Sequence, residues 1–291
     1  MKKLIVSVLF VLGIVSCSNS IPEPETPEVV MNTDRILSLD GPYLSSAFEY
    51  DNQGRVVKFT SQDSNMDYFT EYKYDNDRIY VLYQQYRWSN GEYDLKSQYT
   101  FSREDTLFLV NGRVDSCAGA HKDGNRFFFK YRYNERGELI HLRNENVNER
   151  YRKNPCFVEE VTYEWKDDNI VKVTFYSPNR YNTTNYNTYG YSSLTGNFAF
   201  IEPRSYLTEH DALIANGYFG VACRNLVESV EYSDGYSYLL RFAYELDEHK
   251  RVRTITETHP LGEGHVRYYE YNIKWDIRLS YHNYSHRNVA F

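Results

Sequence analysis

The sequence predicts an all-β protein: an extended, twisted and curled antiparallel sheet of consecutive β-hairpins, with one short helix near residues 208–216. Three observations predict it. Tyrosine is in excess, with 30 among 291 residues, and aromatic side chains favour pleated, half-buried surfaces. No long helical periodicity runs through the chain. A short pattern also recurs, in which two aromatic residues separated by one other precede a polar turn and an alternating strand.

The recurring pattern is clearest at residues 48–59, FEYDNQGRVVKF. Aromatics two positions apart share one face of a strand, and the charged residue between them points to the other face. Asp, Asn and Gly then supply the positive-φ or side-chain-capped positions of a tight turn. Further copies occupy residues 72–81, 131–140, 163–173 and 242–253, and a degenerate last copy starts at Tyr269.

Pairing between these hairpins follows from their size, because one hairpin buries too little surface to be stable alone. We expect successive hairpins to pair edge to edge, with their aromatics aligned in cross-strand ladders worth about 0.2–1 kcal/mol per pair. The result is a single β domain over residues 34–291.

One segment interrupts the hairpins. Residues 208–211, Thr-Glu-His-Asp, resemble a capping box with Asp in place of the usual Glu or Gln. The pattern predicts a short helix after them, with Leu213 and Ile214 facing inward. We expect Asn216 and Gly217 to end this helix in the left-handed conformation.

The first 16 residues have the form of a secretory signal peptide. A cationic start is followed by an apolar run from Leu4 to Val15, shorter than the roughly 20 residues that a membrane-spanning helix needs. The run ends Ile14-Val15-Ser16-Cys17, which resembles a bacterial lipobox. We expect Cys17 to carry lipid and to anchor the chain to a membrane, since acyl chains contribute about 0.8 kcal/mol per buried CH₂. The alternative is an ordinary signal peptide with a chance cysteine.

Residues 17–33 are rich in Pro and Glu and predict an extended tether. In some bacteria, an Asp directly after the lipidated Cys retains a lipoprotein at the inner membrane. Here Cys17 is followed by Ser18 and Asn19 instead. The sequence therefore favours a cell-envelope protein anchored at the outer membrane. It does not indicate whether the body faces the periplasm or the outside.

Charge and cysteine content exclude some functions. Removal of Lys2 and Lys3 with the signal peptide leaves 31 basic against 40 acidic residues, and no Lys/Arg stripe is present. Such a body repels phosphate backbones, so we expect no nucleic-acid partner. The body cysteines are far apart without any CxxC pair, which leaves one disulfide or three buried thiols open and gives no support to a zinc site. They are Cys117, Cys156 and Cys223.

A search for chemistry finds no catalytic, metal or cofactor motif. His282 and His286 lack the Glu of a zinc-hydrolase motif. His259 and His265 bracket a Pro- and Gly-containing loop that we interpret as a solvent-facing hairpin tip rather than a metal site. The carboxylate pairs fall at turn or solvent-face positions, which argues against a glycosidase. These pairs are Glu159 with Glu160 and Glu228 with Glu231.

The hairpin copies resemble YD repeats, the Tyr-Asp units of Rhs and teneurin-type proteins. They are more similar to uncharacterised YD-repeat-like lipoproteins of Bacteroidota envelopes, from residue 34 to the C-terminus. The shared features include the segment Leu213–Gly220, followed by Arg224-Asn225-Leu226. Two departures are the unit around Tyr99–Phe101, which lacks an Asp-Gly turn, and the uncharged run Tyr181–Tyr191. The resemblance implies a fold and a compartment, and no activity.

Exposed aromatics are the remaining candidates for a binding surface, because Tyr and Trp faces stack on sugar rings. The candidate ligand-contacting residues are Trp88, Trp165, Tyr181, Tyr186, Tyr189, Tyr191 and Trp275. The first hypothesis is a non-enzymatic module that binds a glycan, peptide or partner protein. The second is a structural or assembly accessory of a surface complex, and the third is a hydrolase with an unrecognised site.

Overall fold

The computed structural model describes residues 35–42, 44–63, 66–87, 99–121, 125–147, 156–178, 183–196, 210–233, 239–262 and 265–275. All of them belong to one compact unit that runs from Met31 to Phe291. None of the helices in these ranges has the length and apolarity needed to cross a bilayer. Several predictions lie outside the ranges: the signal peptide, the lipidated Cys17, the tether, Trp88, Tyr181 and the histidines at 282 and 286.

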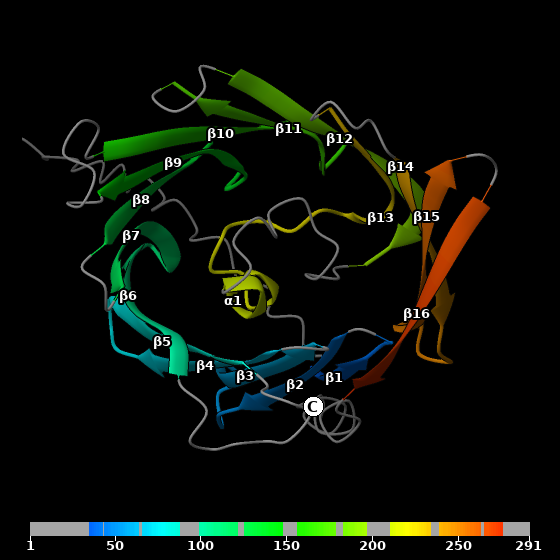
Figure 1. The fold of residues 1–291 in the computed structure, drawn as a ribbon, viewed down its shortest axis with the longest axis horizontal. Helices are drawn as coiled ribbons and strands as arrows, with labels where there is room; N and C mark the ends of the chain where they lie inside the picture. The colour runs from blue at the N-terminus through cyan, green and yellow to red at the C-terminus, as the bar shows by residue number, and fades with distance from the viewer. Residues whose placement is uncertain are drawn as a thin grey trace, which may run out of the picture. The chain divides into compact units, whose positions relative to one another are not determined.

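Sixteen antiparallel strands form one closed barrel around a short helix, α1 (Figure 1). The helix spans Asp211–Ala215. The strands are β1 (Ile36–Asp40), β2 (Leu44–Tyr50), β3 (Val56–Asp63), β4 (Met66–Tyr74), β5 (Arg78–Arg87), β6 (Tyr99–Val110), β7 (Arg113–His121), β8 (Arg126–Tyr133), β9 (Leu139–Val147), β10 (Cys156–Lys166), β11 (Asn169–Ser177), β12 (Thr183–Thr195), β13 (Asn225–Tyr232), β14 (Leu239–Leu246), β15 (Val252–Gly262) and β16 (His265–Trp275).

Closure of the barrel shows that the predicted extended sheet is wrong. Each strand pairs with its successor, and β1 also pairs with β16, from Ile36 opposite Trp275 to Asp40 opposite Asn272. This pairing removes both free edges of the sheet. A hairpin has the same local sequence in an open and in a closed sheet. The difference depends only on the meeting of the first and last strands, which no repeat unit encodes.

The five well-formed predicted hairpins are present, and their turns have the expected chemistry. In three of them a side-chain oxygen before the turn accepts two backbone N–H bonds, at 2.8–3.0 Å, from residues two and four positions later. The accepting residues are Asp51, Asn134 and Asp247. The left-handed position of each turn is Gly54 (φ 84°), Gly137 (φ 79°) or Lys250 (φ 62°). Asx capping thus fixes each register.

The unit around Tyr99–Phe101, which lacks an Asp-Gly turn, turns further along the chain. Tyr99 begins β6, and the hairpin to β7 turns at Asn111-Gly112, with φ values of 52° and 74°. Asp167-Asp168 has the same two positive φ values, 51° and 62°, between β10 and β11. Positive φ at both central residues matches the twist of the flanking strands. The turn at Asn111-Gly112 was not predicted because Phe108 and Leu109, not a pair of aromatics, precede it.

The second aromatic of each repeat joins its hairpin to the strand before it. In seven of the eight even-numbered strands, the last inward-facing ring donates to a backbone carbonyl at the start of the preceding strand, at 2.5–2.8 Å. We call these rings the staples. They are Tyr50, Tyr74, Tyr133, Trp165, Tyr191, Tyr244 and Trp275, bonded to the carbonyls of Ile36, Val56, Val114, Leu139, Ile170, Val227 and Val252. In the last copy, which starts at Tyr269, the staple is Trp275.

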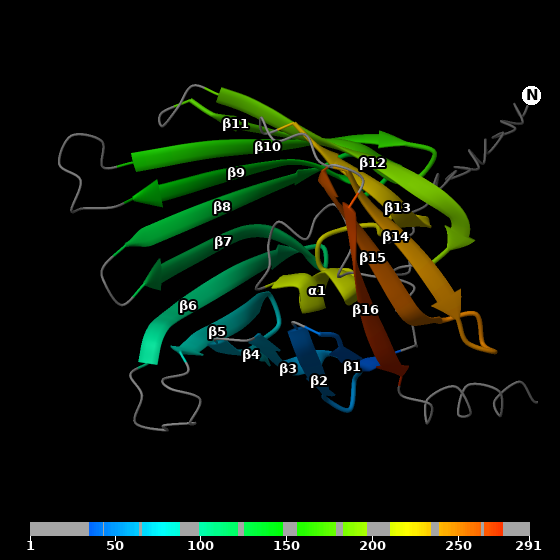
Figure 2. The ribbon, with the colours of Figure 1, turned by 45° about the vertical axis from the view of Figure 1, so that its right-hand side comes forward.

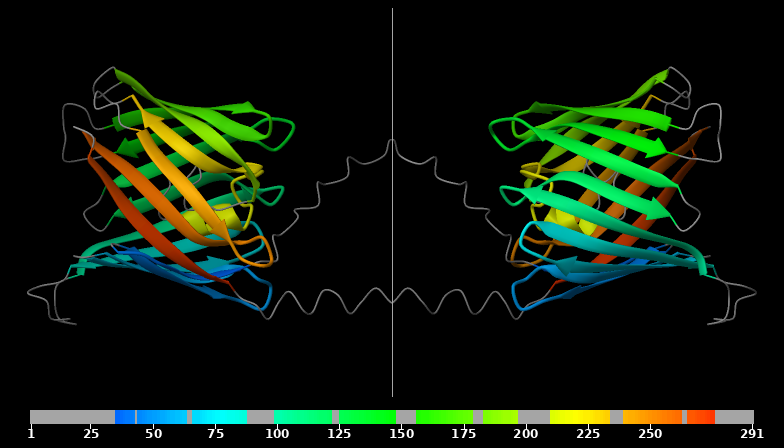
Figure 3. Two further views of the ribbon diagram at one scale, coloured as in Figure 1. Left: turned by 90° about the vertical axis from the view of Figure 1, so that its right-hand side faces the viewer. Right: turned by 90° about the vertical axis from the view of Figure 1, so that its left-hand side faces the viewer.

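The chain between β12 and β13 enters the barrel and forms a plug, defined here as residues 210–224. Its helix lies inside the barrel, toward the end at which the described hairpin turns lie (Figures 2 and 3). Leu213 and Ile214 of α1 are fully buried, as predicted. The predicted cap is wrong: the helix begins after His210, which makes no side-chain capping bond, and Thr208 lies outside the described residues. Gly217 has the predicted left-handed φ of 79°, whereas Asn216 is at −84°.

Backbone hydrogen bonds tie the plug to turns from several hairpins. The bonds are Val114 N–H to Tyr218 O (2.8 Å), Val221 N–H to Gly137 O (3.1 Å) and Arg224 N–H to Asp168 O (3.0 Å). Gly220 permits the closest approach: its φ is +83°, and a Cβ there would lie 2.3 Å from the Gly137 carbonyl oxygen. The plug is thus fastened to neighbouring hairpins at this end of the barrel.

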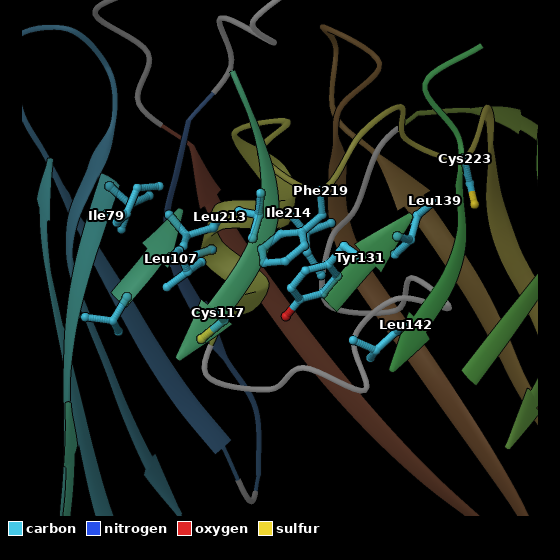
Figure 4. Packing of buried hydrophobic residues seen from close by; sticks show 14 of the residues in the cluster. Ile79, Leu107, Cys117, Tyr131, Leu139, Leu142, Leu213, Ile214, Phe219 and Cys223 are labelled. Atoms are coloured by element: carbon cyan, nitrogen blue, oxygen red, sulfur yellow. The ribbon is translucent and has the colours of Figure 1, made fainter. Parts of the chain in front are cut away.

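The main core surrounds the plug. Phe219 is fully buried, with its ring 5.3 Å from that of Tyr131 on β8 and Leu213 and Ile214 beside it (Figure 4). Inward-facing residues of most strands complete this cluster. Cys117 and Cys223 belong to it, and neither is in a disulfide bond. The side chain of Cys156 lies outside the described part, so its state stays a prediction.

Candidate functional site: the far half of the barrel interior

The inner face of the barrel changes character along the strands. On β9 and β10, the inward-facing pair Leu142 and Val161 is apolar and fully buried. Two residues further from the plug, the next inward pair is Asn144 opposite Glu159. Because side chains alternate with a period of two, these positions share one face. We call the region around the plug the plugged half, and the region beyond it the far half.

The same change occurs on β15 and β16, where it brings together a polar cluster. Ile255 is buried, and the next inward positions of β15 are Glu257 and His259. Glu257 Oε1 lies 2.7 Å from His259 Nε2, and Glu257 Oε2 accepts a 3.0 Å hydrogen bond from the Tyr271 hydroxyl of β16. The ring of Tyr269, opposite Glu257, meets the His259 ring edge to face at 4.9 Å.

Electrostatics keep the Tyr271 hydroxyl of this cluster protonated. Burial raises the pKa of the Tyr271 hydroxyl, and the neighbouring Glu257 carboxylate raises it further. Tyr271 therefore stays a neutral hydrogen-bond donor at any physiological pH. The Glu257 side chain is 17% exposed and that of His259 is 30% exposed, so solvent reaches both from the interior.

Other strands of the far half carry amides and hydroxyls on the inner face. On β12, Asn187 lies opposite Val173, and Asn185, one step further from the plug, is exposed. On β2 and β3, Ser46 donates to Ser61 at 3.2 Å. Amide, carboxylate, imidazole and hydroxyl groups both donate and accept hydrogen bonds. The far half is therefore equipped to bind a ligand rich in hydroxyl or amide groups.

The outer face of several strands carries paired charges. At the outward-facing positions, ion pairs join neighbouring strands: β2 with β3, β9 with β10, β10 with β11, and β14 with β15. They are Glu49–Lys58 (3.2 Å), Glu160–Arg143 (2.7 Å), Glu164–Lys172 (3.5 Å) and Glu245–Arg253 (2.7 Å). A membrane-spanning barrel shows the opposite pattern, with an apolar outer band about 25 Å tall and a polar interior.

The predicted ligand-contacting aromatics that the structure describes have several different environments. Trp165, Tyr191 and Trp275 are staples at the plugged end, and Tyr191 also lies 3.5 Å from Cys223 Sγ. Tyr189 packs inward against the core. Tyr186 is on the outer face, 45% exposed, under the ammonium of Lys172. The structure does not bring these rings into one surface, and their contact with a ligand stays a prediction.

Two residues of the polar cluster, Glu257 and Tyr271, were not predicted as site residues, and His259 was assigned to a hairpin tip. The alternation of β15 carries a signal that identifies them. Glu257 and His259 follow Ile255 at intervals of two, so they share its inward face. Without a barrel, that face has no interior to point into.

Comparison with known proteins identifies the fold. No family model and no curated protein matches the chain. Among solved structures, it is similar to a porin-like protein from Bacteroides uniformis ATCC 8492, with a TM-score of 0.59 and 11% identity over 82% of this chain and 96% of that one. A porin-like protein from Bacteroides vulgatus ATCC 8482 gives a TM-score of 0.55 and 11% identity over 83% and 98%.

The fold is a porin-like barrel. The resemblance to YD-repeat proteins is therefore wrong, because the similar structures are closed barrels and not arrays of hairpins. The resemblance rested on aromatic pairs before polar turns, such as Phe48 and Tyr50. Any antiparallel sheet with one buried face can use that motif, so it does not distinguish these architectures. The Gly217–Gly220 segment, part of the same resemblance, belongs to the plug.

Proposed function

We propose that this protein is a lipid-anchored binding protein of the bacterial cell envelope, held at the outer membrane by Cys17, with a glycan bound in the far half of its barrel. The observation that carries the proposal is the polarity of the two faces. The outer face carries cross-strand ion pairs, and beyond the plug the inner face carries amide, carboxylate and imidazole groups.

The compartment rests on two supports. The signal-peptide pattern ending at Cys17 directs export and lipidation. The similar structures come from Bacteroides and are named porin-like, which fits an envelope barrel. The lipid, rather than the strands, is proposed as the membrane contact, because an Arg or Lys at the midplane of a bilayer costs a barrel about 2–4 kcal/mol. Arg143 and Lys172 lie on the outer face of the strands.

Binding in the far half is supported by its chemistry. Mouths of β-barrels are preferred ligand sites, in which a few convergent polar groups fix the ligand. Glu257 is held by His259 and by Tyr271, so its carboxylate is oriented before a ligand arrives. Preorganisation of this kind lowers the entropic cost of binding. The plug occupies part of the barrel interior at the staple-bearing end, which favours a binding role over a wide channel.

The binding proposal is tested with a glycan array and calorimetry on the mature chain carrying Cys17→Ala. We expect selective binding of one glycan class, weakened at least tenfold by Glu257→Gln, with unchanged folding by circular dichroism. The matched control is Glu160→Gln, which changes a carboxylate on the outer face of β10 and should bind as the parent does. Absence of any glycan binding, or equal loss in both variants, contradicts the proposal; binding of a peptide alone would assign a different ligand class.

The anchoring proposal is tested separately in cells. Radiolabelled palmitate should enter the wild-type protein and not the Cys17→Ala variant. The variant should also appear in the soluble envelope fraction after alkaline extraction. If it stays in the membrane without lipid, the strands themselves span the bilayer and the outer-face argument fails.

A further inference from the structure

Three side chains with metal-binding atoms meet where the plug touches the barrel wall. Asp105 of β6, Cys117 of β7 and His210, directly before α1, each offer one ligand atom, and these atoms lie within 4.8 Å of one another. All three residues are buried, with exposed fractions of 3%, 0% and 1%. They come from three separate elements, so the fold and not the sequence brings them together.

His210 provides a second, independent sign of a missing ligand. Its ring is buried and stacks on Phe219 at 5.9 Å, yet neither ring nitrogen has a hydrogen-bond partner. Nε2 lies 3.4 Å from Asp105 Oδ2, without the geometry of a hydrogen bond. Buried polar atoms in folded proteins nearly always have a partner, so an exception calls for an explanation such as an ion or a water.

Neighbouring residues of the barrel strands orient the Asp105 carboxylate toward Cys117 and His210. Arg103 donates to it through Nε, 3.0 Å from Oδ1, and through Nη2, 2.8 Å from Oδ2. Gly119 leaves the space that the carboxylate needs, because a Cβ there would lie 2.4 Å from Asp105 Oδ1 and 2.0 Å from the Phe127 ring. A carboxylate that accepts two such bonds still has lone pairs for a cation. Arg103 thus acts as an outer partner that fixes a ligand, as in many metal sites.

Tyr131 adds a fourth polar group. Its hydroxyl is buried without a hydrogen-bond partner, and burial raises its pKa well above the usual value, as do Cys117 and Asp105 nearby. Figure 4 shows Tyr131 and Cys117 next to each other below Phe219. A neutral hydroxyl here can donate to a thiolate or lie next to a cation.

We propose that Asp105, Cys117 and His210 bind a zinc-class divalent cation that fastens the plug to the barrel wall. Imidazole nitrogen, thiolate sulfur and carboxylate oxygen are the donors that zinc prefers, and tetrahedral sites combine them freely. Bonds of about 2.0–2.3 Å to four ligands need only a small contraction of this cluster. Tyr131 or a water takes the fourth position. Since His210 belongs to the plug and the other two ligands to the wall, the metal stabilises the plugged barrel by binding only the folded state.

The test uses the full mature chain, refolded from denaturant with Co²⁺, a spectroscopic substitute for zinc. We expect one bound ion per chain and a thiolate-to-cobalt absorption band in the near ultraviolet. Cys117→Ser should abolish the band while the protein stays folded. The matched control is Cys223→Ser, which removes another buried plug-region thiol and should keep the band. Zinc should displace cobalt, and zinc should raise the melting temperature of the wild type and of Cys223→Ser but not that of Cys117→Ser.

A second variant guards against a folding defect at position 117. His210→Asn should lower cobalt affinity at least tenfold and leave the circular dichroism spectrum unchanged. A folded wild-type protein that shows no thiolate band and no bound metal overturns the proposal, and identifies the cluster as polar groups around buried water. A band that survives in Cys117→Ser overturns it too, because the metal then lies elsewhere.

Discussion

The plugged half and the far half of the barrel interior are built from the same strands and differ in what they face. In the plugged half, each wall residue meets a plug that comes from a distant part of the chain, as Tyr131 meets Phe219. In the far half, several inward side chains are polar and reach solvent, as Asn185 and His259 do. The comparison indicates that the plugged half supplies most of the buried core, and it leaves polar groups of the far half open to solvent.

The largest expected difference between the halves concerns core truncation. Phe219→Ala removes a fully buried ring of the plug and should lower the free energy of unfolding by about 3–5 kcal/mol. Asn187→Ala, in the far half, should change it by less than about 1 kcal/mol. Urea denaturation followed by circular dichroism measures both. Similar losses of unfolding free energy in the two variants would contradict the proposed difference between the two halves.

The staples should have a smaller effect. Tyr74→Phe deletes the hydroxyl that donates to Val56 O at 2.6 Å and leaves that carbonyl without this donor. We expect a loss of about 1 kcal/mol, the usual net value of a buried hydrogen bond. Tyr186→Phe, an exposed tyrosine on the outer face, is the control and should be neutral. If both variants unfold at the wild-type urea concentration, the ring alone and not the hydrogen bond joins the hairpins.

Acid should loosen the turns of the plugged end. At Asp51 burial is the largest single influence and raises the pKa, but the N–H groups of Arg55 and Gln53 and the Arg55 side chain outweigh it and lower the pKa below 3.8. The lowered pKa of Asp247 has the corresponding causes. Because the unfolded chain binds these protons first, the stability from both carboxylates is present above about pH 4 and is lost as the pH falls through the folded pKa.

Asn134 provides the comparison within the molecule, since it caps the same turn without a charge. The double variant Asp51→Asn/Asp247→Asn should therefore lose less stability than the wild type between pH 4 and 3. Chemical denaturation at a series of pH values measures this. Parallel profiles for the two proteins would mean that other carboxylates govern the acid response.

The smallest expected effect is a gain in stability. Lys250 has a φ of 62° at the position that Gly54 and Gly137 occupy in the equivalent turns. A left-handed conformation costs a residue other than Gly about 1–2 kcal/mol, and Lys250→Gly removes this cost. Gly also increases the entropy of the unfolded chain, so the net gain in the free energy of unfolding should be below about 1 kcal/mol. Gly54→Ala is the reverse control and should destabilise, because a Cβ at that position meets the Arg35 guanidinium.

Local sequence patterns predicted the local structure well. Phe48 and Tyr50 share a face, as their spacing predicts, and Asp51 with Gly54 forms the expected turn. The helix that buries Leu213 and Ile214 was also predicted. The site was predicted less well: Glu257 was not identified, and His259 was placed at a hairpin tip. Their alternation with Ile255 was readable, but a polar residue on an inward face has meaning only when the sheet encloses a space.

The sequence by itself determined the strands, the turns and the face that each aromatic occupies, because these depend on side-chain alternation and on backbone φ within a few residues. Only the tertiary structure decided that β1 meets β16, that the 210–224 segment enters the barrel, and that Asp105, Cys117 and His210 converge. The physical reason is that these contacts join segments far apart in the chain, and their energy comes from burial and closure that no single hairpin contains.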